Sequence, residues 1–128
     1  CLDLLRQLNC EVELEGDDIY FTYQNENFMI EASNECHFIV VWDLCWYMKS
    51  LENQEEVELV KEAVNRVNSI NCNIVLYYED REANTLNVAS KSYHLLTPDI
   101  PNPKAYLSVI FSNFFETKQC FRKELDCD

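Results

Sequence analysis

The sequence of 128 residues contains a single glycine, Gly16, and three prolines. A phosphate-binding loop needs several glycines whose backbone can approach the phosphates, so the chain has no loop of this type. With one glycine, most backbone positions of positive φ must be taken by Asn and Asp, which tolerate this region. This accounts for much of the asparagine in the segments QNEN and ASNEC.

Positive charge is also scarce, because 10 Lys+Arg stand against 23 Asp+Glu and the net charge is −13. Nucleic acids and anionic membranes are bound through cationic side chains, so we expect neither as a partner. A basic or apolar polypeptide segment suits this charge better. The most apolar run, Phe38–Met48, is too short to span a bilayer and contains Asp43.

The seven cysteines include no C-x-x-C pair, and with two histidines they form no zinc-type cluster, so we expect no metal and no cofactor. Their odd number favours free, mostly buried thiols in a reducing cytoplasm. One alternative is a disulfide between Cys120 and Cys127, which face the same way if the last helix extends that far. Another is a lipid-modified terminus at Cys1, although LDLLRQL resembles a helix rather than a tether.

Candidates for catalysis are few, because only His37 and His94 could assist a cysteine nucleophile. Cys36 and His37 are neighbours in a predicted strand and point to opposite faces. Asp43 is the one carboxylate in an apolar setting, and its position favours a strand-end cap over a perturbed pKa. The chain is therefore predicted not to be an enzyme.

The hydrophobic patterns predict one α+β domain over residues 1–128, in which helices pack on an antiparallel sheet in the order α-β-β-β-α-β-β-α. The segment CEVELEGDD alternates and then turns at Gly16. Beyond Asp43 the segment LCWYMKSLEN is predicted to be an aromatic-rich connection. Helices are expected at 1–9, at 54–70 and from Pro103 onward, and strands at 18–24, 28–33, 37–42, 73–79 and 85–96.

The helix over 54–70 carries three asparagines at every third position, although Asn is a mediocre helix former. Asn68 lies at the edge of the apolar face, so we expect its amide to be largely buried and bonded to the sheet or the following strand. Asn71 is predicted to end the helix in the αL conformation, and Asn65 to face solvent. The alternative is that these amides line a ligand site. The predicted apolar face comprises Leu59, Val60, Ala63, Val64, Val67 and Ile70.

The chain has more aromatic residues than one small core requires, and Tyr20, Tyr77 and Tyr78 lie on strands. Tyr, Trp, Phe and Met are typical of interface cores, so part of this set is predicted to contact another chain. The alternative is that all of them fit one core. The interface candidates are Trp42, Trp46, Tyr47, Met48, Tyr77 and Phe115.

A family resemblance rests on three segments: NRVN in the central helix, YLSVIFSNFF in the last helix and YFTYQNENFMIEAS in the early hairpin. Together they resemble the YbjN-like group of bacterial proteins, regarded as sensory transduction regulators, over roughly residues 14–122. This resemblance implies the type III secretion chaperone-like fold. It also implies a compact, dimer-forming module that binds polypeptide and has no established chemistry.

Two functions are consistent with these features. The first is a cytoplasmic, non-enzymatic protein-interaction module, chaperone-like or regulatory, that acts as a homodimer. The alternative is a small-molecule sensor domain with an aromatic pocket between the sheet and the last helix. An exposed sheet edge favours the first, because added strands bind there, and an enclosed pocket favours the second.

Overall fold

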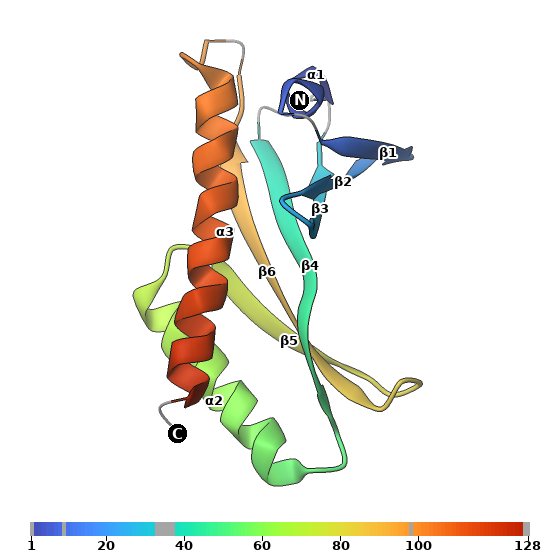
Figure 1. The fold of residues 1–128 in the computed structure, drawn as a ribbon, viewed down its shortest axis with the longest axis vertical. Helices are drawn as coiled ribbons and strands as arrows, with labels where there is room; N and C mark the ends of the chain where they lie inside the picture. The colour runs from blue at the N-terminus through green and yellow to red at the C-terminus, as the bar shows by residue number, and fades with distance from the viewer. Residues whose placement is uncertain (1, 9, 33–37, 98, 127–128) are drawn as a thin grey trace. The chain divides into compact units, whose positions relative to one another are not determined.

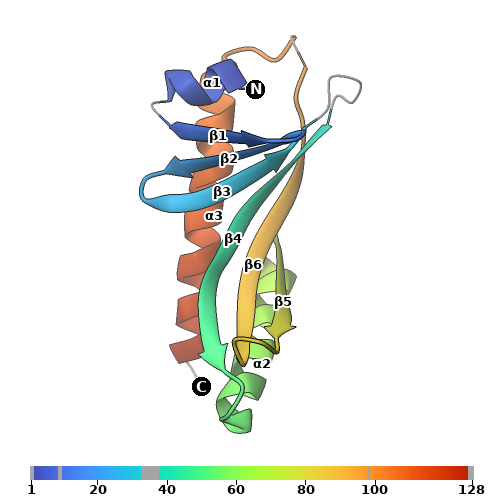
Figure 2. The same cartoon turned by 90° about the vertical axis from the view of Figure 1, so that its right-hand side faces the viewer.

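The computed structural model describes residues 2–8, 10–32, 38–97 and 99–126 (Figures 1 and 2). Cys1, Cys36, His37 and Cys127 lie outside the described residues, and so does the predicted disulfide at Cys127. The elements in chain order are α1 (Leu2–Gln7), β1 (Glu11–Glu15), β2 (Asp18–Tyr23), β3 (Glu26–Glu31), β4 (Phe38–Ser50), α2 (Gln54–Ile70), β5 (Ile74–Asp80), β6 (Thr85–Leu95) and α3 (Pro103–Asp126).

The strands form a six-stranded sheet in the order β1-β2-β3-β4-β6-β5. The pairs β1/β2, β2/β3 and β3/β4 are antiparallel, which confirms the predicted α+β class with an antiparallel sheet. Four strands, rather than the predicted three, precede α2. The additional strand is β1, whose alternating sequence EVELE pairs with β2.

The chain divides into two compact units. Unit 1 comprises Cys1–Leu44 and Lys91–Phe111, and unit 2 comprises Cys45–Ser90 and Ser112–Asp128. The elements β4, β6 and α3 each contribute residues to both units. The two units are described separately below.

In unit 1, alternation along β2 and β3 directs one set of side chains onto the first half of α3. The ring of Phe111 lies 5.3 Å from that of Phe21 and 5.5 Å from that of Phe28, measured between centroids. The ring of Tyr23 lies 4.9 Å from the same ring. The buried apolar residues of unit 1 are Leu5, Ile19, Phe21, Phe28, Ile30, Ile39, Val41, Leu107, Ile110 and Phe111.

In unit 2, α2 and the second half of α3 lie on the same side of β5 and β6 (Figure 1). Phe121 is fully buried in the cluster that these elements form, and the rings of Trp46 and Tyr47 pack on it at 5.0 and 5.1 Å. The buried residues of this cluster are Val57, Val60, Ala63, Val64, Val67, Val75, Leu86, Val88 and Phe121.

The predicted end of β4 at Asp43 is wrong, because the strand continues to Ser50. The segment predicted as an aromatic-rich connection is therefore the second half of this strand. Asp43 is fully buried and lies opposite Phe28 on β3 rather than at a strand end. Main-chain pairing does not depend on the side chain, and the aromatic residues that follow are favoured on a pleated surface, so the carboxylate does not stop the strand.

The bounds of α2 match the prediction, and Glu55 and Glu56 lie in its first turn. Asn53 caps the helix, and its side chain accepts a hydrogen bond from the Glu56 backbone N at 3.2 Å. The buried face differs from the one predicted. Val57 is buried, whereas Leu59 is 36% exposed and Ile70 is 63% exposed.

The αL conformation predicted for Asn71 is also wrong. Asn71 is the C-cap residue, but its backbone is extended, with φ −125 and ψ 154. Its side chain accepts a hydrogen bond from the Thr117 hydroxyl at 2.8 Å, and the chain then enters β5 without a left-handed turn. A contact to α3 therefore takes the place of an αL cap.

Positive φ falls mainly on asparagine, as the single glycine predicts. The early hairpin turn contains Gln24 and Asn25, and the turn between β5 and β6 contains Asn84. Asn102, with φ 49, precedes α3, and the Ala105 backbone N donates to its side chain at 3.4 Å. Pro103 is the first residue of α3, as predicted.

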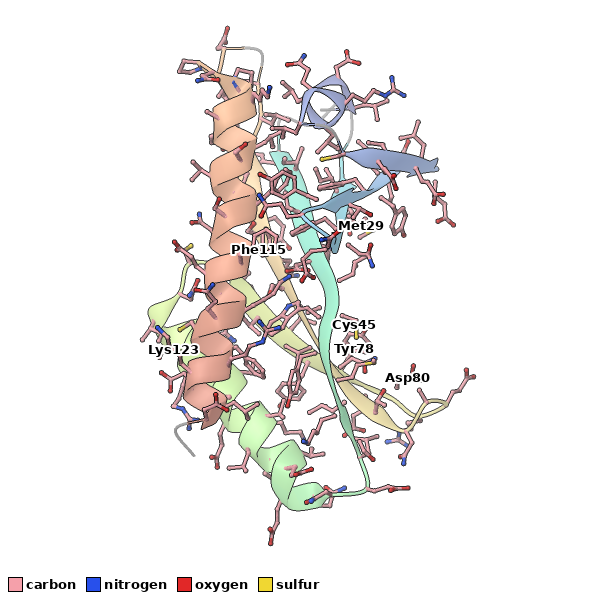
Figure 3. The ribbon with its side chains drawn as sticks, viewed as in Figure 1. Met29, Cys45, Tyr78, Asp80, Phe115 and Lys123 are labelled. Carbon is pink, nitrogen blue, oxygen red and sulfur yellow. The ribbon has the colours of Figure 1, made fainter. Side chains whose placement is uncertain are left out.

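The described cysteines are free but not mostly buried, so that prediction is wrong for them. Cys45 and Cys72 are exposed, and Cys10 and Cys120 are half-buried. Cys72 lies in the turn before β5, and Cys45 lies on the side of β4 away from the helices (Figure 3). No helix among the described residues is long and apolar enough to cross a membrane.

Candidate functional site

In unit 1, the face of the sheet opposite the buried core carries a row of large side chains. Register places Tyr20 of β2 opposite Met29 of β3, and Met29 opposite Trp42 of β4. Directly opposed residues share a face of the sheet, and all three side chains are half-buried. Figure 3 shows Met29 on the side of β3 that faces away from α3.

Lys91 of β6 completes this row. Its Nζ lies 5.1 Å from the centroid of the Trp42 ring and 5.4 Å from that of Tyr93, which is 57% exposed. The Trp42 Nε1 donates to Glu31 Oε1 at 2.9 Å. These contacts orient the aromatic rings before any partner binds. We call the surface formed by Tyr20, Met29, Trp42, Lys91 and Tyr93 the open face.

Acidic residues border the open face on β1. Register places Glu13 opposite Tyr20, Glu11 opposite Thr22 and Glu15 opposite Asp18. All three glutamates are exposed. The open face thus combines aromatic and thioether groups with a negatively charged border.

In unit 2, β5 is the last strand in the sheet order of the described residues. The Asn68 amide of α2 bonds to the backbone of this strand at Val75. Its Nδ2 donates to the Val75 O at 2.8 Å, and its Oδ1 accepts from the Val75 N at 2.8 Å. The predicted bond to the following strand is present, but Asn68 is exposed rather than largely buried.

This pair of hydrogen bonds fixes the direction of the β5 backbone. The N–H and C=O of one residue in an antiparallel strand point to the same side, so those of Val75 point away from β6. By alternation, those of Tyr77 and Glu79 point to the same outer side. We call this side of Val75, Tyr77 and Glu79 the β5 edge. Tyr78 is 45% exposed and lies on the face away from the helices (Figure 3).

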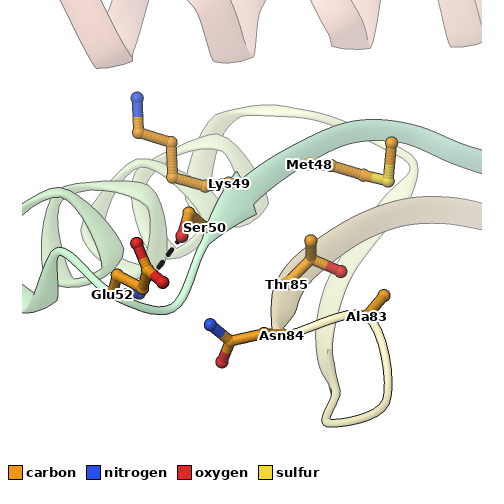
Figure 4. A pocket seen from close by; sticks show the side chains of 7 residues that line it. All are labelled: Met48, Lys49, Ser50, Glu52, Ala83, Asn84 and Thr85. Carbon is orange, nitrogen blue, oxygen red and sulfur yellow. Dashed lines mark hydrogen bonds between the residues drawn. The ribbon is translucent and has the colours of Figure 1, made fainter.

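A hollow of about 410 Å³ lies where the end of β4 meets the turn between β5 and β6, and it opens widely to solvent (Figure 4). In it, the Glu52 N donates to Ser50 Oγ at 3.2 Å. No aromatic residue and no residue of α3 lines it, so it is not the aromatic pocket described as the alternative above. The lining residues are Met48, Lys49, Ser50, Glu52, Ala83, Asn84 and Thr85.

The six interface candidates are dispersed. Trp46 and Tyr47 pack on Phe121 inside unit 2, and Trp46 Nε1 donates to Ser90 Oγ at 3.0 Å. Phe115 is half-buried, with the Lys118 Nζ 4.9 Å from its ring centroid.

The other three candidates are accessible. Trp42 belongs to the open face, Met48 is 63% exposed beside the hollow, and Tyr77 lies on β5 with 40% of its surface exposed. The Lys61 Nζ of α2 lies 5.6 Å from the Tyr77 ring centroid.

Three residues of the open face were missed from sequence: Met29, Lys91 and Tyr93. Alternation was the available signal, since Lys91 and Tyr93 are two positions apart on β6 and share a face. The contact of Lys91 with Trp42 joins two residues that are 49 positions apart in the sequence, which no local pattern reveals.

Titratable groups of unit 1 include His94, whose Nε2 lies 2.6 Å from Ser92 Oγ. Burial lowers the pKa of His94 below its ordinary value, and burial raises the pKa of the Cys10 thiol. Within the described ranges, no three His, Cys, Asp or Glu side chains are grouped so that they could hold a metal ion.

Comparison with known proteins bears on the fold. No family model matches the chain, and no curated protein matches it. The chain is similar to an uncharacterized protein from Methanothermobacter thermautotrophicus known from its crystal structure, with a TM-score of 0.59 and 15% sequence identity. The match covers 98% of this chain and 93% of that one, and at this identity it shows a shared fold alone.

Proposed function

We propose that the protein is a non-enzymatic interaction module that acts as a homodimer and binds a polypeptide on the open face. The observation that carries this proposal is the row from Tyr20 through Met29 to Trp42, on the sheet face opposite the buried core of unit 1. Aromatic residues and Met are enriched at protein interfaces, and this row keeps part of its surface accessible on one face of the sheet.

The charge of the open face indicates the chemistry of the partner. Three exposed glutamates of β1 border the face, and the whole chain carries −13. An apolar segment with Lys or Arg residues beside it complements this surface, because its apolar groups contact the rings and its cations meet the carboxylates. The resemblance to YbjN-like proteins, and the chaperone-like binding that it implies, supports the same function in a cytoplasmic setting.

A matched pair of variants tests binding on the open face. Met29→Glu places a carboxylate in the aromatic row, whereas Val109→Glu places one on α3, where Val109 is 61% exposed. In affinity capture from the native cytoplasm, followed by mass spectrometry, we expect wild type and Val109→Glu to retain the same partner and Met29→Glu to lose it. Equal capture by all three proteins would contradict the proposal.

The homodimer is tested separately by sedimentation equilibrium at micromolar concentration. We expect a mass near twice 15.2 kDa. A monomer at every accessible concentration would rule out this part of the function.

A sensor function is the second candidate, and the hollow at the end of β4 is the observation that favours it. Its volume of about 410 Å³ falls within the range of small-ligand sites, and Lys49, Ser50 and Asn84 supply polar groups. Thermal unfolding with a metabolite library is the test. A ligand that stabilises wild type but not Asn84→Gly, which keeps the positive φ and removes the amide, would support it, and equal shifts in both would contradict it.

A further inference from the structure

We propose that the homodimer forms through the β5 edge, where β5 pairs antiparallel with β5 of a second copy. The proposed register places Tyr78 opposite its counterpart and Tyr77 opposite Glu79. This inference rests on the proposed function, because it assigns the surface through which the same homodimer assembles.

The β5 edge is available for strand pairing over part of its length. The sequence IVLYYED contains neither proline nor lysine, which commonly protect an edge strand, and its charged residues Glu79 and Asp80 come only at its end. The Asn68 amide forms hydrogen bonds with the backbone N–H and C=O of Val75. Val75, the first outward-facing residue of the strand, is therefore not available to pair with a second copy. Figure 1 shows β5 diverging from α2 toward the turn that leads to β6.

Five symmetric registers pair the outward-facing residues of two β5 strands with each other. Two of them place Val75 opposite its own counterpart or opposite Tyr77, which would require Asn68 to leave Val75. Pairing Tyr77 with its own counterpart places Val75 opposite Glu79, which would require Asn68 to leave Val75 in both copies. Pairing Glu79 with its counterpart places two carboxylates directly opposite each other, which is unfavourable. Pairing Tyr77 with Glu79 keeps the Asn68 bonds and avoids the like-charge contact, so the structure favours this register.

Charge complementarity supports the same register. A residue directly opposite Tyr77 points to the same face of the sheet, and on that face the Lys61 Nζ lies 5.6 Å from the Tyr77 ring. The incoming Glu79 therefore meets Lys61 of the other copy. Two-fold symmetry repeats this contact, so each dimer contains two Lys61–Glu79 pairs.

The other edge of the sheet is unsuited to self-pairing. β1 carries Glu11, Glu13 and Glu15, so two copies of β1 would bring carboxylates together. On β5 the self-complementary register instead places the two exposed Tyr78 rings face to face on the side away from the helices. The occupant of the β5 edge is therefore a second copy of this chain.

Disulfide trapping at Tyr78 tests the register. The variant Tyr78→Cys is made in a chain that also carries Cys45→Ser and Cys72→Ser, which removes the two thiols that are exposed in the described part of the chain. Opposed residues of a non-hydrogen-bonded pair have Cα atoms about 4.5 Å apart, which a disulfide can span. We expect mild oxidation to convert Tyr78→Cys into a covalent dimer. The same background with Tyr77→Cys, and the background alone, should remain uncrosslinked.

A charge exchange provides a second test that requires no new cysteine. Lys61→Glu and Glu79→Lys each create like-charge contacts, so each should weaken the dimer about tenfold, and the double variant should restore it. Circular dichroism verifies that each variant is folded. A dimeric wild type with no Tyr78→Cys crosslink and no rescue overturns the β5 register but leaves the homodimer in place. A monomeric wild type overturns the homodimer itself.

Discussion

The two outer strands of the sheet protect their edges by different means. β1 has a glutamate at every second position, Glu11, Glu13 and Glu15, and in unit 1 the helix α1 lies beside it (Figure 2). β5 has apolar and aromatic side chains, and a single amide from Asn68 occupies its backbone at Val75. Repeated charge discourages pairing along the whole strand, whereas a side-chain cap closes one position and leaves the next ones open.

This difference explains why the central helix tolerates asparagine. Asn68 supplies a carboxamide, which has the same donor and acceptor as a peptide group and can replace one residue of a neighbouring strand. Asn71 bonds to Thr117 of α3 and joins the helix to the start of β5. Asn65 is exposed on α2. Asn68 and Asn71 therefore position β5. The hypothesis that the asparagines stabilise the fold depends on these two residues and not on Asn65.

The largest effect is expected from Thr117→Val, which breaks the attachment at the start of β5. The Thr117 hydroxyl is fully buried, accepts from Asn73 Nδ2 at 3.1 Å and bonds to Asn71 Oδ1 at 2.8 Å. Valine keeps the shape but leaves the buried Asn73 amide without this partner. We expect a loss of about 1 to 3 kcal/mol in the free energy of unfolding, measured by urea denaturation.

A matched control for this change is Thr85→Val, since Thr85 is half-buried on β6 and its hydroxyl donates to Asn87 Oδ1 at 2.9 Å. Its loss should be smaller than that of Thr117→Val. Equal losses at the two positions would show that the Asn71–Asn73–Thr117 contacts add nothing particular to β5.

A smaller effect on stability is expected from Asn68→Ala, which removes both hydrogen bonds to Val75. The position is exposed, so water can reach the freed backbone groups, and we expect a loss of about 1 kcal/mol. The same variant opens the β5 edge, so its tendency to self-associate should rise. Denaturation and light scattering measure the two consequences.

Asn65→Ala is the control for that experiment, because Asn65 is exposed on the same helix and Ala is the better helix former. It should be neutral or slightly stabilising and should leave association unchanged. If the two alanine variants behaved alike, the capping role of Asn68 would be refuted.

A change in association without a large change in stability is expected when β1 loses its charge. Replacing Glu11, Glu13 and Glu15 with Gln removes the like-charge contacts that oppose β1 pairing. With both edges able to pair, assembly should continue beyond the dimer, and sedimentation velocity should show larger species. The control replaces the exposed acids Glu52, Glu55 and Glu116, and an identical shift there would assign the effect to net charge alone.

The elements that sequence analysis predicted are those with strong local signals. Glu55 and Glu56 in the first turn mark the start of α2, Pro103 marks the start of α3, and alternation marks the hairpin of β2 and β3. The length of β4 could not be predicted in the same way. A buried carboxylate at Asp43 depends on the surroundings that the folded chain provides, and the local pattern favours a strand end there.

The candidate site was harder to predict than the fold. Residues from Phe38 to Trp42 are apolar on both faces, so the pattern does not indicate which face the helix covers. Trp42 lies on the open face, whereas Trp46, four positions later on the same strand, packs against Phe121. The distinction between the open face and the core depends on long-range contacts. Residue type alone does not distinguish Trp42 from Trp46, so the sequence predicted the same role for both.

The smallest effect is expected at His94, which lies on β6 rather than on an outer strand of the sheet. Burial lowers the pKa of His94 in the folded state, so the unfolded chain binds a proton more readily. Its contribution to stability is therefore complete above the ordinary histidine pKa of about 6.5 and is lost as pH falls from there toward the folded value.

His94→Gln should lose less stability than wild type between neutral and mildly acidic pH, with His37→Gln as the control for the other histidine. Neither outer strand contains a histidine. The dissociation constant of the dimer should therefore change with pH to the same extent in wild type and in His94→Gln. A pH response of unfolding that His94→Gln leaves intact would assign the titration to another group.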